Sequence, residues 1–241
     1  MTPNMKKITV DNSIPSFYHE SDSKLHRFKR KLTLLPILRL VKKYLFGKEK
    51  FSLLEIGSGS GFLLSFLEEA YPSASFTGIE YDERLVPVIR NKLRNATIMQ
   101  GNAEDFNIAA KDFDMIVSLQ VIEHLYKPEQ MLKSVKEHLK KDGIFIFTTP
   151  NPKGLGAKIM KENWHGIRED HVSMKSFAEW KEISEKAGFK ALYCGTTFFT
   201  GIPLMNKLPF GLLNWALLLA FGSLPWAHGE SFVGVFKNAK D

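Results

Sequence analysis

A glycine-rich segment early in the sequence has the composition of a ligand-binding turn. Residues 51–56 form a short apolar run, and Gly57, Gly59 and Gly61 follow at alternate positions before a helical pattern starts at Phe62. Glycine lets the backbone turn sharply and leaves room for a ligand against it, and the N-terminus of the following helix presents amide groups to the same place. The alternative is that these glycines only close a tight strand-to-helix turn.

The residues around these glycines indicate which ligand would fit. A dinucleotide fingerprint has a third small residue where this chain has Phe62, and no Gly-Lys-Ser/Thr sequence closes a P-loop. Glu55, inside the apolar run, suits a cationic ligand better than a pyrophosphate. Glu80 ends the next apolar run, where a carboxylate can accept hydrogen bonds from both hydroxyls of a ribose. Together these features indicate S-adenosylmethionine, a cation with a ribose and no phosphate.

The sequence resembles the class I S-adenosylmethionine-dependent methyltransferases over about residues 50–195. Besides the glycine loop, residues 101–105 follow the third predicted strand, residues 113–125 resemble the fourth-strand motif of the family, and residues 141–150 resemble its entry to the fifth strand. The match is specific for the cofactor and weak for the substrate.

The resemblance implies a set of residues that contact the cofactor. Those near its methionine part and ribose would be Glu55, Gly57, Ser58, Gly59, Gly61 and Glu80. Those near the adenine and the transferable methyl group would be Tyr81, Asn102, Ala103, Leu119 and Gln120. For the second group, ordinary polarity of surface loops is the alternative explanation.

Two histidines are the candidate catalytic residues. Methyl transfer is an in-line displacement in which alignment of the partners supplies much of the rate, and a phenol, carboxylate or thiol acceptor gains from a base within hydrogen-bond reach. Histidine suits this task because its usual pKa is near neutrality. His124 follows the fourth predicted strand, and His165 and His171 precede a later helix. We predict that His124 and His171 act as base or acceptor contact; hydrogen bonding behind the site and packing at a helix start are the alternatives.

The sequence leaves open whether a metal assists the reaction. Within the family, quinone-biosynthesis O-methyltransferases carry a similar Glu-His pair after the fourth strand and can bind a metal there, which the resemblance would place at Glu123 and His124. Their additional carboxylate corresponds to Gln120 in this chain. We therefore predict no metal ligands.

The patterning around these residues predicts strands that alternate with helices. The expected strands are residues 51–56, 75–81, 96–100, 113–119, 143–149, 189–194 and 232–236, and the expected helices are residues 62–70, 83–94, 128–140 and 173–187, the last capped by Ser173. A further helical pattern starts at Ser23, and Pro36 should kink or divide it. Continuously apolar strands that alternate with helices indicate a parallel sheet covered on both faces.

We therefore predict an α/β, Rossmann-like fold with a mostly parallel seven-stranded sheet and helices on both faces. Residues 1–50 would form an N-terminal arm and helical cap, and residues 51–241 the methyltransferase domain, with an apolar insertion at about residues 198–229 before the last strand. Residues 208–229 contain no charged side chain but are too few and too interrupted to span a bilayer. They could form a core helix, a lid over an apolar acceptor, or a contact with a membrane surface.

The charge distribution is uneven and bears on the choice of partner. The formal net charge is +7, and residues 1–50 alone carry twelve Lys and Arg against four acidic residues. Such a basic region could meet anionic lipid, nucleic acid or an acidic substrate, or it could be a solvated helix face. Nucleic acid is disfavoured, because residues 118–121 do not resemble the Asn/Asp-Pro-Pro-aromatic motif of base methyltransferases and the basic region lacks interleaved exposed aromatics.

The sequence thus predicts methyl transfer from S-adenosylmethionine, with S-adenosylhomocysteine as product, to oxygen of a small or lipophilic acceptor. Transfer to nitrogen or carbon, a macromolecular acceptor, and a cofactor-binding module without turnover are the alternatives.

The single cysteine, Cys194, allows no internal disulfide framework and fits a reducing compartment. No secretory signal is visible in residues 1–10. We therefore expect a cytoplasmic enzyme, with peripheral membrane contact and oligomeric state left open.

Overall fold

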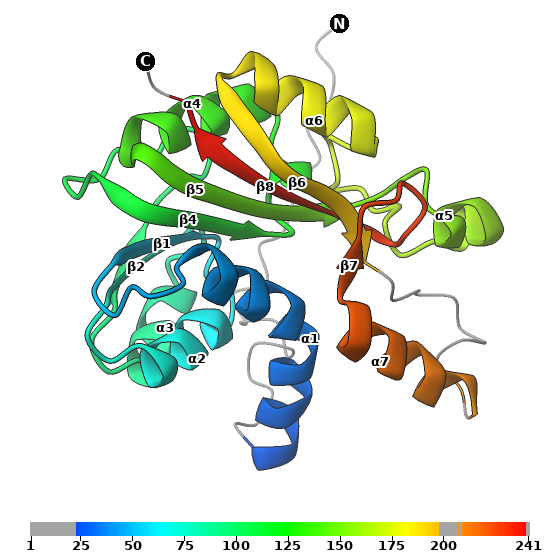
Figure 1. Cartoon of the computed structure of the whole chain (residues 1–241), viewed down its shortest axis with the longest axis horizontal. Coiled ribbons are helices and arrows are strands. Elements are labelled where there is room, and N and C mark those ends of the chain that lie inside the picture. The colour runs from blue at the N-terminus through cyan, green and yellow to red at the C-terminus, as the bar shows by residue number, and fades with distance from the viewer. Residues whose placement is uncertain (1–22, 198–206, 208, 240–241) are drawn as a thin grey trace, which may run out of the picture.

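An eight-stranded sheet forms the centre of the computed structural model, which describes residues 23–197, 207 and 209–239 (Figure 1). The strand order is β3-β2-β1-β4-β5-β8-β6-β7. The parallel part comprises β1 (Ser52–Ile56), β2 (Ser75–Glu80), β3 (Thr97–Gln100), β4 (Phe113–Leu119) and β5 (Leu139–Pro150). The antiparallel part comprises β6 (Phe189–Thr197), β7 (Ser223–Leu224) and β8 (Ser231–Asn238).

The predicted mostly parallel sheet is confirmed, but the predicted number of strands was one too low. The additional strand, β7, has two residues and pairs with Thr196 and Thr197 at the edge of the sheet. A pairing of two residues leaves no apolar run that a sequence pattern could reveal. The order of strands reverses between β1 and β4, and in open α/β sheets ligands bind beside the carboxyl ends of the strands at such a point.

Helices cover both faces of the sheet. One face carries α1 (Lys24–Tyr44), α2 (Phe62–Ala70) and α3 (Leu85–Lys92), and the other carries α4 (Pro128–His138) and α6 (Phe177–Lys186) (Figure 1). Each face has its own apolar core. Short helices α5 (Leu155–Met160), η2 (Ile122–His124) and η3 (Lys161–Asn163) lie in the connections, and α7 (Phe210–Phe221) precedes β7.

The first helix is continuous and contains Pro36 within it. Figure 1 shows that α1 changes direction along its length, as expected where proline removes a backbone hydrogen bond and crowds the preceding turn. Its N-terminal half is fastened to α2, because Arg27 donates to Ser65 and forms an ion pair with Glu69. The rest of the predicted arm, residues 1–22, and residues 198–206 and 208 of the predicted insertion lie outside the described residues.

The start of α6 differs from the prediction. Ser176, and not Ser173, is the N-cap residue, and its side chain and that of Glu179 form a reciprocal capping box. A capping box satisfies two amide groups at once, which favours this position over a serine without an acidic partner three residues later. The amide of Ser173 instead donates to the carbonyl of Glu123 (2.9 Å), so the segment before α6 is held against the end of β4.

No helix among the described residues is both long and apolar enough to cross a membrane.

One carboxylate joins the N-terminal ends of β1, β4 and β5. Asp114 accepts hydrogen bonds from the backbone amide of Ser52 (2.9 Å) and from Lys140 (2.8 Å) and Lys48 (3.2 Å). Partial burial opposes ionisation, but the hydrogen bonds from Lys140, Ser52 and Lys48 prevail and lower the pKa of Asp114 to about 2.

The variant Asp114→Asn should therefore be less stable at neutral pH. A carboxylate with a lowered pKa stabilises the fold above its unfolded pKa, near 3.9, and loses this effect as the pH falls through about 2. Allowing for solvent screening, we expect the free energy of unfolding at pH 7 to fall by about 1–2 kcal/mol, with a smaller difference at pH 3. Urea denaturation measures both values. The neighbouring exposed Asp112→Asn is the control, and an equal loss at pH 3 would contradict the assignment.

Candidate active site

The glycine turn after β1 has the backbone that only glycine adopts easily. Gly57, Gly59 and Gly61 have φ angles of +76°, +51° and +73°, in the region that disfavours side chains. A Cβ atom on Gly57 would overlap the side chain of Val121, which follows β4. The amides of Gly57 and Ser58 donate to the carbonyl of Ile79 in β2 (2.8 and 3.0 Å). The turn is thus held against the ends of two other strands.

Two buried carboxylates lie beside this turn. Glu80 accepts from the amides of Gly59 (2.7 Å) and Asp82 (3.1 Å), and each of its oxygens retains capacity for another donor. Glu55 is buried, and its Oε2 has no hydrogen-bond partner among the described residues. Burial, together with the charge of Glu80, raises the pKa of Glu55 well above its usual value. A cation placed between these carboxylates would relieve that cost.

The predicted adenine contacts follow β2 and β3, which are neighbouring parallel strands. Tyr81 is largely exposed, and its carbonyl accepts from the side chain of Gln100 (3.3 Å). Asn102 is exposed and its side-chain oxygen accepts from the amide of Glu104 (3.0 Å), whereas Ala103 is buried. All three therefore lie at the same edge of the sheet as Glu80.

The predicted methyl-site residues lie where β4 ends. Leu119 is the last residue of the strand and is partly buried. Gln120 has a positive φ of +55°; its backbone amide donates to the carbonyl of Thr148 (3.0 Å) and its side-chain amide donates to the hydroxyl of the same residue (3.1 Å). This pairing with β5 fixes the backbone from which the next turn, η2, begins.

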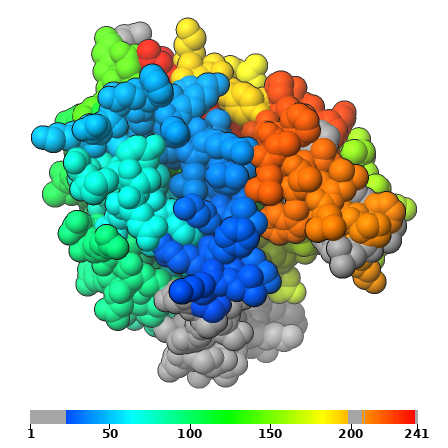
Figure 2. Space-filling model, turned by 60° about the horizontal axis from the view of Figure 1, so that its bottom comes forward, coloured from blue at the N-terminus to red at the C-terminus, as the bar shows by residue number. Residues whose placement is uncertain are grey.

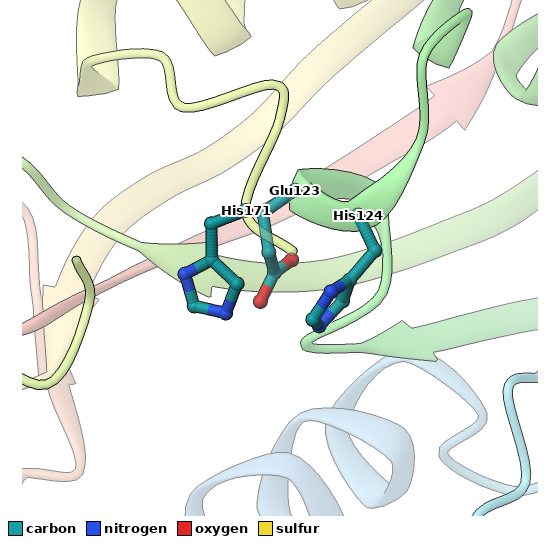
Figure 3. Close-up of side chains that lie close together, drawn as sticks. All are labelled: Glu123, His124 and His171. Atoms are coloured by element: carbon teal, nitrogen blue, oxygen red, sulfur yellow. The ribbon is translucent and has the colours of Figure 1, made fainter. Parts of the chain in front are cut away.

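The structure brings the two predicted catalytic histidines together with a third residue, Glu123. The ring centroids of His124 and His171 are 4.7 Å apart and nearly perpendicular. Figure 3 shows the carboxylate of Glu123 between the two imidazoles. Each of the three side chains has a nitrogen or oxygen atom of a kind that can bind a metal, and these three atoms lie within 4.8 Å of one another. The turn after β4 and the segment before α6, which are distant in sequence, therefore form one cluster.

Hydrogen bonds orient both rings in the same way. Nδ1 of His171 lies 2.8 Å from the carbonyl of Gly166, and Nδ1 of His124 lies 3.1 Å from the carbonyl of Asp170. A carbonyl only accepts, so each neutral ring donates from Nδ1 and keeps the lone pair on Nε2 available for a proton. Nδ1 of His124 also lies 3.3 Å from the carboxylate of Asp170.

Burial sets the protonation of the cluster. Glu123 is fully buried, and both its oxygens lack a hydrogen-bond partner in the described part of the chain. Burial raises the pKa of Glu123 to about 7. Partial burial lowers the pKa of His124 below its usual value; the charge of Asp170 opposes this and His171 adds to it. Perturbed groups gathered beside a pocket are typical of active sites.

A pocket of about 270 Å³ opens next to this cluster. Its wall is mainly apolar and includes Pro152, Ala157, Trp164, Ile167 and Met174, with His171 on one side. Lys161 and Arg168 also line it, and Arg168 forms an ion pair with Asp170 (2.9 Å). The pocket is therefore suited to an apolar body that carries a polar group near the histidines.

The third histidine of this region does not join the cluster. Nδ1 of His165 lies 3.4 Å from the buried carboxylate of Glu230, which also accepts from the indole of Trp164.

Sequence reasoning missed Asp170, and it named Glu123 only as a counterpart of a metal ligand. Both stand next to a predicted catalytic histidine in the sequence, and that adjacency was the available signal.

The three clustered side chains also have the donor types of a divalent-cation site. Gln120, whose amide pairs with Thr148, is not among them. The prediction of no metal is neither supported nor contradicted by this geometry.

Comparison with known proteins places the chain among methyltransferases. The family model for a methyltransferase domain matches residues 25–193. A malonyl-acyl-carrier-protein O-methyltransferase from Paenibacillus sp. is 26% identical over 155 residues, covering 59% of this chain and 56% of that protein. A ubiquinone biosynthesis O-methyltransferase from Cereibacter sphaeroides is 32% identical over 118 residues, covering 46% and 47%. The chain thus spans about half the length of these curated relatives.

A solved structure shows the same fold. The plantazolicin methyltransferase BpumL, crystallised in complex with a pentazolic desmethylPZN analogue and S-adenosylhomocysteine, superposes with a TM-score of 0.61 at 19% identity, covering 93% of this chain and 89% of that one. The resemblance inferred from the glycine loop is confirmed. The chain belongs to the methyltransferase domain family, within the class I S-adenosylmethionine-dependent methyltransferases.

Proposed function

We propose that the chain transfers a methyl group from S-adenosylmethionine to an oxygen atom of a small or lipophilic acceptor in the cytoplasm. The observation that carries this proposal is the cluster of Glu123, His124 and His171, beside which a mainly apolar pocket opens. Val121 packs on Gly57 and is two residues from Glu123, so the two halves of the site are adjacent.

The glycine turn and its carboxylates would hold the cofactor. Gly57, Ser58, Gly59 and Gly61 would hold the methionine part, and its ammonium group would pair with the buried carboxyl group of Glu55. Glu80 would accept hydrogen bonds from the ribose hydroxyls and keep its bonds from backbone amides. Tyr81, Asn102 and Ala103 would contact the adenine, and Leu119 and Gln120 would lie near the methyl group. The geometry of the carboxylates supports this assignment, because Oε2 of Glu55 is buried without a hydrogen-bond partner in the part of the chain that the structure describes.

The cofactor supplies an electrophilic methyl group on a sulfonium. The pocket would align the acceptor oxygen with that carbon and exclude water, so that the new C–O bond forms as the C–S bond breaks. Nε2 of His171 takes the acceptor proton, and S-adenosylhomocysteine is released. The ring of His124, whose centroid is 4.7 Å from that of His171, would share the proton-accepting role. No metal is required for this sequence of steps.

The chemistry of the pocket supports an oxygen acceptor attached to an apolar body. Ionisable oxygen acids such as phenols and carboxylic acids match a neutral imidazole base, and the two curated relatives are named as O-methyltransferases. The thiol of Cys194 does not compete as a nucleophile, because burial raises its pKa to about 11. Formation of S-adenosylhomocysteine over a panel of phenols, carboxylic acids, thiols and amines tests the proposal, and turnover of amines alone would overturn it.

The variant Gly59→Arg should abolish cofactor binding and keep the fold. Its side chain would enter the space that the methionine part needs, beside the carboxylate of Glu80. Isothermal titration with S-adenosylhomocysteine measures binding, and circular dichroism checks the fold. The control is Gly47→Arg, since Gly47 also has a positive φ (+76°) but has open space around it. Unchanged affinity in Gly59→Arg would count against the cofactor site.

The variant His171→Ala should lower kcat by about 10²-fold or more, the usual contribution of a general base, without a change in cofactor affinity. His165→Ala is the matched control, because His165 lies in the same segment but pairs with Glu230. Rates and affinities come from product formation and calorimetry. Equal losses in both variants would indicate that the segment is merely disturbed.

The dependence of kcat on pH should report His124, which accepts a proton only when neutral. Partial burial lowers the pKa of His124, so the rate should fall only as the pH drops below the usual range of histidine. Asp170→Asn removes the carboxylate that favours the imidazolium form of His124, so the acid limb should move to lower pH. Dialysis against EDTA should leave both profiles in place. An acid limb that moves to higher pH in Asp170→Asn, or disappears after EDTA, would contradict the assignment.

A further inference from the structure

The helix α7 has the reverse of the usual polarity of a surface helix. Its single side chain with a polar amide, Asn214, is buried, on the same face as Gly211 and Leu218. The opposite face carries Leu212 and Leu213, which are 67% and 52% exposed. Surface helices in water normally bury the apolar face and expose the polar one.

The exposed face continues along the whole helix. Ala216 and Ala220 follow Leu212 and Leu213 at spacings of three, four and seven residues, and both are exposed. Residues on such spacings share one side of a helix. No charged side chain occurs from residue 208 to residue 229, so this face is apolar without interruption.

A strongly cationic helix adjoins it. The segment Lys24–Tyr44 that forms α1 contains eight Lys and Arg residues and no Asp or Glu. Those that are exposed are Lys24, Lys29, Lys31, Arg39, Lys42 and Lys43. Two large apolar side chains of the same helix, Leu25 and Phe28, are more than half exposed.

Direct contacts join the two helices. The guanidinium group of Arg39 donates to the carbonyl of Leu219 in α7. Pro36 lies against Gly222, at which a Cβ atom would be 3.1 Å from that of the proline. Figure 2 shows α1 in blue and α7 in orange side by side on one face of the molecule. The cationic and the apolar side chains therefore belong to one continuous surface.

We propose that α7 and α1 form a surface that docks on an anionic lipid membrane. The leucines of α7 enter the boundary between headgroups and acyl chains, and the lysines and arginines of α1 contact lipid phosphates. Charge decides between a membrane and a second copy of the chain: a symmetric dimer through this surface would bring two cationic helices together, whereas anionic lipid neutralises them. The surface is separate from the histidine cluster, so the proposal does not depend on the acceptor chemistry.

Flotation of the full chain with vesicles tests the proposal. The protein should float with vesicles of phosphatidylcholine and phosphatidylglycerol, bind phosphatidylcholine alone much more weakly, and lose most binding in high salt. The variant Leu212→Glu/Leu213→Glu should weaken partitioning into the vesicles at least tenfold, because burial of one leucine side chain in the membrane already contributes a factor of about ten. The control Leu192→Glu, at an exposed position of β6, should not.

The charge contribution has its own variant. Lys42→Glu/Lys43→Glu should weaken binding to the anionic vesicles by more than tenfold, because each basic residue near such a surface contributes a factor of about five. The control Lys141→Glu/Lys190→Glu, at exposed positions of β5 and β6, should change this binding little. Circular dichroism and formation of S-adenosylhomocysteine from a water-soluble acceptor should be unchanged in all variants. If the leucine variant misfolds, the lysine variant and the salt dependence decide the question.

Three results would overturn the proposal. The first is equal flotation of the parent and of both the α1 and α7 variants, and the second is no flotation of the parent with anionic vesicles. The third is a dimer in light scattering that Leu212→Glu/Leu213→Glu dissociates, which would assign the apolar face to a second copy of the chain.

Discussion

The left-handed turn after β1 is the constraint on which the arrangement of the site depends. Gly57 has no room for a side chain against Val121, and its amide and that of Ser58 share one acceptor, the carbonyl of Ile79. The amide of Gly59 donates to Glu80. These contacts hold the ends of β1, β2 and β4 together. The glycine turn, the carboxylate of Glu80 and the histidine-bearing turn therefore cannot move independently.

Two carboxyl groups of the site are buried. Glu55 and Glu123 are both buried, and both carry oxygens without a partner among the described residues. Most buried polar groups in proteins are hydrogen-bonded, so such exceptions call for an explanation. In each case burial raises the pKa of the carboxyl group. A cationic cofactor beside Glu55, and a proton or an acceptor beside Glu123, would supply the missing partners.

The histidine cluster and the exposed surface of α1 and α7 lie on different parts of the fold. Strands β1 to β5 and their connections build the site, whereas α1 and α7 lie outside the sheet and expose cationic and apolar side chains. The segment 151–172, which follows β5, lines the pocket and is anchored at one end by Asn151, whose amide donates to the carbonyl of Glu230 (2.9 Å), and at the other by Ser173. Most of the pocket wall thus comes from one segment that is held at both of its ends.

Sequence alone determined the cofactor class and the core of the fold, because both depend on local patterns. The spacing of Gly57, Gly59 and Gly61, with carboxylates at Glu55 and Glu80, reflects backbone geometry that neighbouring residues dictate, and apolar runs reveal buried parallel strands. Tertiary structure alone decided what depends on distant contacts. It added β7, a pairing too short to leave a pattern, moved the start of α6 to Ser176, placed His171 against His124 and turned His165 toward Glu230. It also joined α1 to α7, because residues far apart in a chain meet only when packing brings their elements together.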